Sequence, residues 1–126
     1  MTIIDRKLPH KEPVRFIKEV LEEGDDYAIS LVEFKEKPTL PAVVEASAQN
    51  TIFILSLFEI YHIGMLTGMK NIETYQELNA GVYRVETKIG ASLDNFFIFN
   101  FVLSQNGKKF VDGEITILLE KRDEKL

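Results

Sequence analysis

Two apolar segments near the N-terminal end of the chain predict a β-hairpin. Residues 13–21 fit either a short helix or a strand. Residues 27–32, Tyr-Ala-Ile-Ser-Leu-Val, are rich in residues that favour strands. Gly24-Asp25-Asp26 lies between the two segments and is typical of a turn. Together the segments therefore predict two paired strands at the start of the fold.

A long apolar segment follows and predicts one enclosed helix from about Ala42 to Tyr61. Pro38 and Pro41 mark its start, because proline's fixed φ and missing N–H suit a first helical turn. On a helical wheel of about 100° per residue, one narrow stripe holds four polar side chains and an isoleucine: Glu45, Gln49, Ser56, Glu59 and Ile52. Nearly every other position is apolar, so we expect a sheet to surround this helix.

The second half of the chain carries strand patterns. We expect strands at residues 63–72, 81–89, 96–103 and 110–119. The segment 92–95 predicts a turn, and Asn106-Gly107 is a strong hairpin signal. The order of elements is therefore two strands, one long helix and about four antiparallel strands. This order predicts an α+β fold with one helix packed on one sheet.

The length of 126 residues predicts a single domain over residues 1–126. A hydrophobic content of 45% and a charged content of 28% are typical of a soluble globular protein. The net charge of −5 and the pI near 5.1 argue against a nucleic acid as the main partner. There is no cysteine, and two histidines are too few to indicate a zinc site, so no metal is expected.

The targeting signals of the sequence are weak. The first residues contain no apolar stretch of signal-peptide length, so a cytoplasmic location is expected. The segment 42–63 approaches the length of a membrane span. It carries Glu45 and Glu59, and two carboxylates in a lone span would be costly. We therefore expect a buried helix and no membrane span.

Two motifs of this chain resemble those of a known family. Residues 8–14, Leu-Pro-His-Lys-Glu-Pro-Val, resemble the LPHRxPF opening of beta-hydroxyacyl-(acyl carrier protein) dehydratases. Residues 38–42 and 45–49, PTLPA and EASAQ, resemble their P-x-x-P-G and E-A-x-A-Q helix start. The alanine after the second proline is similar to divergent relatives associated with aryl-polyene-type lipid pathways. The resemblance implies a hotdog fold, in which a curled antiparallel sheet surrounds a central helix, and a homodimer or a dimer of dimers.

The resemblance also implies chemistry. In that family a loop histidine removes the α-proton of a 3-hydroxyacyl thioester, and a helix carboxylate assists departure of the hydroxyl as water. The carboxylate corresponds to Glu45, and backbone N–H groups at the helix start, near Pro41 and Ala42, would hold the thioester oxygen. Glu33 stands where the loop histidine is expected, so His10 is a tentative proton acceptor.

The candidate residues also have plain structural interpretations. Glu45 could simply cap the helix, Gln49 could fix that carboxylate from the next turn, and His10 could bond backbone at a bend. His62 fits a helix-end cap. Glu33 could act as a second base, and its neighbours Lys35, Glu36 and Lys37 fit a solvated loop. Several apolar side chains could line a tunnel for the acyl chain or simply fill the core: Phe53, Leu57, Phe58 and Met65. A basic rim for an acidic carrier, or a scattered surface, would comprise Lys35, Lys37, Arg84, Lys88, Lys108 and Lys109.

The leading hypothesis is a dehydratase-like lyase that eliminates water from 3-hydroxyacyl thioesters of acyl carrier protein, in fatty-acid or polyene-type synthesis. It assigns catalysis to Glu45 with His10, and substrate binding to Pro41, Ala42, Gln49 and Phe53. It needs no cofactor, and its partner is acyl carrier protein or a coenzyme A thioester. A hotdog thioesterase is an alternative, because one helix carboxylate can activate water. A non-catalytic acyl-binding subunit that lacks the loop histidine is another.

Overall fold

The computed structural model describes residues 15–58, 60–61 and 64–121. A strand pair comes first, formed by β1 (Ile17–Glu23) and β2 (Tyr27–Phe34). Helical turns follow in the order α2 (Leu40–Asn50), η1 (Thr51–Phe53) and α3 (Leu55–Phe58). The later strands are β3 (Met65–Thr74), β4 (Gly81–Leu93), β5 (Phe96–Gln105) and β6 (Lys108–Leu118). The α+β class and the order of elements are as predicted.

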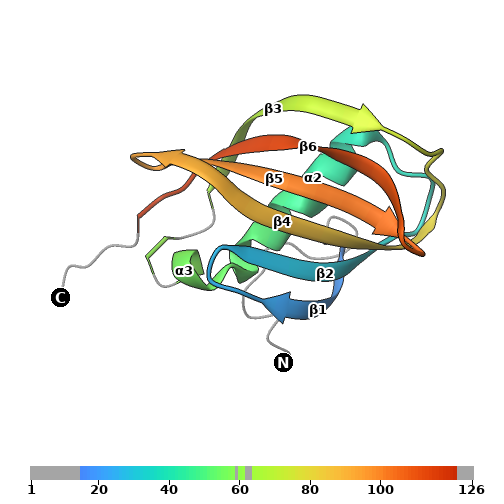
Figure 1. Cartoon of the computed structure of the whole chain (residues 1–126), viewed down its shortest axis with the longest axis horizontal. Helices are drawn as coiled ribbons and strands as arrows, with labels where there is room; N and C mark the ends of the chain where they lie inside the picture. The colour runs from blue at the N-terminus through green and yellow to red at the C-terminus, as the bar shows by residue number, and fades with distance from the viewer. Residues whose placement is uncertain (1–14, 59, 62–63, 122–126) are drawn as a thin grey trace.

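The described strands form one antiparallel sheet in the order β1-β2-β4-β5-β6-β3. The sheet curls around α2, which packs on its inner face (Figure 1). The predicted hairpin is confirmed, and the ambiguous segment 13–21 supplies strand β1 rather than a helix. The predicted turn at Asn106-Gly107 is confirmed as well, because both residues have positive φ (54° and 78°), as a tight two-residue hairpin loop requires. The predicted turn at 92–95 is narrower, since β4 continues to Leu93.

The predicted helix from Ala42 to Tyr61 is wrong in length. α2 has 11 residues, η1 adds three, and Ile54 then adopts an extended conformation (φ −78°, ψ 118°). The β1–β2 turn provides the physical reason, because its carbonyl groups accept N–H bonds from the chain beyond this break. Leu55 N–H donates to Gly24 O (2.9 Å), and Ser56 N–H donates to Asp25 O (3.2 Å).

The break has two consequences for the sequence predictions. The polar stripe does not continue along one helix, because Ser56 lies on α3, beyond the end of α2. In the part of the chain that the structure describes, no helix combines the length and the apolar character needed to cross a bilayer.

The core lies between α2 and the inner face of the sheet. Along β5, every second side chain is buried against the helix, and neighbouring strands follow the same alternation. The fully or nearly buried apolar residues of this layer include Val43, Val44, Ala46, Tyr83, Val85, Phe97, Phe99, Phe101, Leu103, Val111, Ile115 and Ile117. This packing holds α2 in a fixed position across the sheet.

Polar side chains near the end of α2 fix its rotation. Asn50 is completely buried, and its Oδ1 accepts the hydroxyl proton of Ser30 (2.6 Å). Its Nδ2 donates to Ala28 O (2.9 Å) and to Thr87 Oγ1 (3.1 Å). One side chain therefore ties α2 to both β2 and β4, and this determines what the first turn of the helix faces.

Candidate functional site

The first turn of α2 is built by a threonine and a proline. Thr39 is the N-cap, and its Oγ1 accepts the N–H of Ala42 over 3.3 Å, while its carbonyl accepts the N–H of Val43 (3.1 Å). Pro41 has no N–H to offer. The backbone N–H donors in the first turn of α2 that do not bond a helix carbonyl are therefore those of Leu40 and Ala42. The Ala42 bond is long, so a stronger acceptor would displace the threonine hydroxyl.

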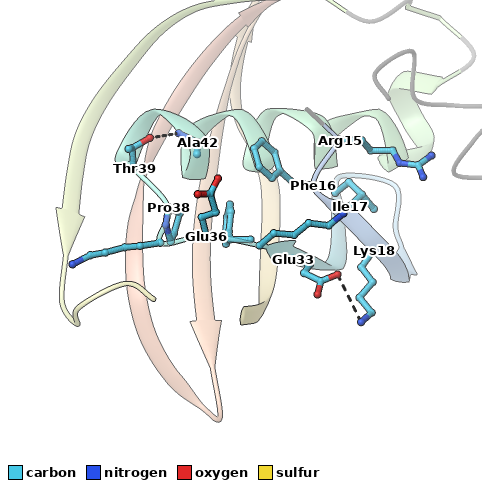
Figure 2. A pocket seen from close by; sticks show the side chains of 12 residues that line it. Arg15, Phe16, Ile17, Lys18, Glu33, Glu36, Pro38, Thr39 and Ala42 are labelled. Carbon is cyan, nitrogen blue, oxygen red and sulfur yellow. Dashed lines mark hydrogen bonds and ion pairs between the residues drawn. The ribbon is translucent and has the colours of Figure 1, made fainter. Parts of the chain in front are cut away.

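A cavity of about 500 Å³ lies beside this turn, which is a size that suits a small-molecule ligand. Three segments form it (Figure 2). Residues 15–18 come from the start of β1, residues 33–39 from the end of β2 and the connection to α2, and Ala42 from the helix. The cavity thus exists only because β1, β2 and α2 meet at this end of the sheet.

The walls of the cavity combine an apolar surface with charged side chains. Phe16 and Phe34 form the aromatic part, with ring centroids 5.3 Å apart. Phe34 is nearly fully buried and also packs edge-on against Tyr83. Figure 2 shows the carboxylate of Glu36 pointing toward the first turn of α2, near Ala42. The carboxylate of Glu36 and Ala42 of the first helical turn therefore line the same cavity.

The lining carries more positive than negative charge. Its basic residues are Arg15, Lys18, Lys35 and Lys37, and its acidic residues are Glu33 and Glu36. Four positive and two negative side chains give a formal excess of +2, whereas the whole chain carries −5. Lys18 lies 4.0 Å from Glu33, and Lys37 pairs with Glu77 outside the lining (3.4 Å). An anionic ligand is therefore favoured at this place on an otherwise acidic protein.

The structure separates the site residues that the sequence suggested. Ala42 lines the cavity, and Pro41 lies exposed beside it. Glu45 is half-buried one turn further along α2 and is outside this lining. Gln49 is buried, and its Oε1 accepts the N–H of Phe16 (2.9 Å), so it holds the start of β1 against the helix. Phe53 is completely buried in the core.

The remaining candidates are spread over the fold. His10 and His62 lie outside the described residues, as does the side chain of Phe58. Leu57 is buried, whereas Met65 is 66% exposed on β3.

The six basic residues do not form one rim. Lys35 and Lys37 line the cavity, while Lys88 and Lys108 are exposed on other strands. Arg84 pairs with Glu86 (3.7 Å), and Lys109 pairs with Asp112 (3.0 Å).

The sequence interpretation missed the carboxylates of the cavity. Glu36 belongs to a segment that we expected to be a solvated loop, and Glu33 was considered as the replacement for a histidine and as a second base, but not as part of a cavity wall. Their position was the available signal, because they flank Phe34, the last buried residue of β2, just before the proline that leads into α2. A connection between a strand end and a helix start often carries binding residues.

Comparisons with known proteins show the fold. No protein-family model matches the sequence, and no curated protein matches it significantly. Among solved structures, the dehydratase heterocomplex ApeI:P from Xenorhabdus doucetiae has a TM-score of 0.73 at 16% identity, covering 98% of this chain and 93% of that chain. A sigma28-regulated virulence protein from Campylobacter jejuni has a TM-score of 0.68 at 14% identity, covering 98% of both chains.

A hypothetical thioesterase protein with coenzyme A from Streptococcus pneumoniae has a TM-score of 0.66 at 9% identity, covering 83% of this chain and 88% of that chain. These neighbours are hotdog proteins and include a dehydratase heterocomplex and a hypothetical thioesterase. The chain therefore has the hotdog fold that the sequence resemblance implied, and at these identities the likeness extends to the fold alone.

Proposed function

We propose that this protein binds an acyl thioester in the cavity at the start of α2 and hydrolyses it. The observation that carries the proposal is the arrangement of Glu36 beside the first turn of α2 inside a cavity with excess positive charge. The carrier is coenzyme A or acyl carrier protein, whose phosphates match that charge. A structural neighbour that contains coenzyme A supports this class of ligand.

Each part of the cavity has a role in this proposal. The N–H groups of Leu40 and Ala42 donate to the thioester oxygen, where negative charge develops during attack. Glu36 accepts a proton from a water molecule, and the water oxygen attacks the carbonyl carbon. The C–S bond then breaks, and the thiolate leaves and takes up a proton. The products are a carboxylic acid and the free thiol of the carrier.

Elimination of water from a 3-hydroxyacyl thioester is the second candidate. The motif at residues 8–14 and the likeness to a dehydratase heterocomplex favour it. In this reaction the α-proton leaves to a base, for which His10 is proposed. Glu45 donates a proton to the departing hydroxyl, and a carbon–carbon double bond forms. Glu45 lies one helical turn beyond Ala42, so a ligand that extends along α2 from the cavity would approach it.

Two assays on the purified chain distinguish these reactions. Release of free thiol from acyl-coenzyme A substrates measures hydrolysis, and formation of the conjugated enoyl thioester from 3-hydroxybutyryl-coenzyme A measures elimination. We expect Glu36→Gln to lower kcat/KM for hydrolysis by about 100-fold or more, which is the usual contribution of a general base. Glu73→Gln changes an exposed carboxylate on β3 and serves as the matched control.

The outcomes separate the two proposals and a non-catalytic role. Elimination activity that falls in Glu45→Gln and survives in Glu36→Gln would replace hydrolysis by the second candidate. Tight binding of acyl-coenzyme A with no turnover in either assay would contradict both reactions and identify a non-catalytic acyl-binding subunit.

A further inference from the structure

Phe16 lines the cavity, but the reaction proposed above gives it no role. It lies just before β1, is half-buried and packs against Phe34. Its backbone is held on two sides. The N–H of Phe16 donates to Oε1 of Gln49 on α2 (2.9 Å), and its carbonyl accepts the N–H of Glu33 on β2 (2.9 Å). This residue therefore joins the helix to the strand at one side of the cavity.

The phenyl ring of Phe16 lies beside α2. Among the described residues of that helix, Ala42 alone lines the cavity. Figure 2 shows the ring of Phe16 next to the helix, further from Thr39 than Ala42 is. On the inner face beyond Ala42, Val43 and Ala46 are fully buried. A ligand that runs along the inner face of α2 from the first turn therefore meets the ring of Phe16.

The second aromatic side chain of the wall, Phe34, is fixed by the core. It is nearly fully buried between Phe16 and Tyr83, with ring centroids 5.3 Å and 5.8 Å away. Tyr83 is itself buried, and its hydroxyl donates to Asn79 O (2.9 Å). Close-packed rings in a core resist displacement, so Phe34 does not move aside to lengthen the cavity.

Charged side chains flank the ring of Phe16. Lys18 Nζ lies 4.0 Å from Glu33 Oε1, and both side chains line the cavity while about half exposed to solvent (52% and 43%). An alkyl chain that passed beside the ring would contact these hydrated charges and would gain little from burial. The apolar part of the lining is limited to Phe16, Ile17, Phe34, Pro38 and Ala42.

We infer that Phe16 ends the acyl part of the cavity and restricts this protein to short acyl groups, as in acetyl and butyryl thioesters. The inference rests on the proposed binding of an acyl thioester between Glu36 and the first turn of α2. Phe53 and Leu57, which the sequence suggested for an acyl tunnel, are buried and lie outside this lining, so they do not extend it.

Binding of S-alkyl-coenzyme A thioethers tests this limit without any reaction, because a thioether cannot be hydrolysed. Isothermal titration calorimetry compares the S-butyl and S-octyl compounds. Each methylene that enters an apolar site should tighten binding by about fourfold. For the wild-type chain we expect dissociation constants within about twofold of each other, since the additional methylenes stay in water.

Substitution of Phe16 should remove the limit. In Phe16→Ala the S-octyl compound should bind about tenfold or more tighter than the S-butyl compound, because several methylenes then become buried. Phe16→Leu keeps an apolar side chain in place and should change the ratio in the same direction by less. Phe110→Ala is the matched control, since Phe110 is also half-buried and packs on Tyr83 (5.2 Å) but lies outside the lining. Circular dichroism and thermal unfolding confirm that the variants are folded.

The outcomes separate this inference from the proposed reaction. A length limit that Phe16→Ala removes, in a chain that releases no thiol from any acyl-coenzyme A, supports the inference and contradicts hydrolysis. Wild-type binding that tightens steadily from butyl to octyl overturns the inference and leaves hydrolysis standing. Folded Phe16→Ala and Phe16→Leu variants that both keep the wild-type ratio overturn it as well, and so does a chain that binds none of the thioethers.

Discussion

At the scale of single residues, the buried polar side chains of α2 hold the helix against the sheet. Asn50 and Gln49 are buried and hydrogen-bonded to β-strand and strand-end partners. Glu45 is half-buried, and Thr39 caps the helix at the cavity. Buried polar groups that make all their hydrogen bonds specify one arrangement of the core. The buried residues thus fix the rotation of α2, and with it the direction in which its first turn faces the cavity.

Asn50→Ala is expected to lower the free energy of unfolding by about 3 kcal/mol. The substitution leaves buried polar groups of β2 and β4 without their partner, and each such group costs about 1–3 kcal/mol. Urea unfolding measures the loss. Asn79→Ala removes an exposed amide and should change stability by less than about 0.5 kcal/mol. An equally small loss at Asn50 would show that its bonds add little to the stability of the fold.

At the scale of the elements, the end of α2 and the docking of β3 depend on backbone contacts. The break at Ile54 is fixed by bonds from Leu55 and Ser56 to the β1–β2 turn. β3 docks on β6 with Gly64 against the backbone of Leu118, where a Cβ would overlap the carbonyl oxygen. Four residues later, a Cβ on Gly68 would meet no atom within 4 Å. A side chain is therefore sterically excluded at Gly64 and can be accommodated at Gly68.

Alanine substitutions test this difference directly. Gly64→Ala should destabilise the chain by about 1–3 kcal/mol, since β3 must move away from β6 to accommodate the methyl group. Gly68→Ala should be neutral or stabilise by up to about 1 kcal/mol, because it restricts the unfolded chain and finds open space. Midpoints of urea unfolding compare the two variants. Equal losses would indicate that strand propensity rather than close approach governs β3.

At the scale of the whole molecule, charge is distributed unevenly. The chain carries −5, yet the lining of the cavity has an excess of two positive charges. Long-range repulsion from the acidic surface therefore opposes binding of a phosphate-bearing carrier, while the local field at the cavity favours it. The attraction acts at shorter range and is the larger of the two at the cavity, and raising the salt concentration weakens it because the Debye length falls from about 10 Å at 0.1 M to about 3 Å at 1 M.

Ionic strength should consequently affect KM when the substrate carries phosphates. Raising the salt concentration from about 50 mM to about 500 mM should increase KM for an acyl-coenzyme A several-fold and leave kcat unchanged. The corresponding acyl-pantetheine, which has no phosphate, should show little change under the same conditions. Steady-state kinetics with both substrates measure this. Equal salt effects on the two would contradict a role for the cavity's positive charge.

The comparison of sequence and structure follows the same scales. Alternating apolar residues, the Asn106-Gly107 turn and the prolines at the start of α2 determined the elements, because these signals act within a few residues. The length of the helix was mispredicted, since the bonds that end it come from Gly24 and Asp25, about 30 positions away. Glu36 was overlooked for a similar reason, because only the meeting of β1, β2 and α2 turns its loop into a cavity wall.

The sequence by itself determined the order of elements, a helix packed on one sheet and the place where the helix starts, because periodicity, turn residues and caps are local. The hotdog arrangement was implied by the resemblance of its motifs to a known family. The tertiary structure alone decided where α2 ends, which carboxylates lie in the cavity, and which apolar residues remain on the outer face. Those properties depend on contacts between distant segments and on the registers of Phe96 and Ile98 across β4, β5 and β6. No pattern within a single segment contains that information.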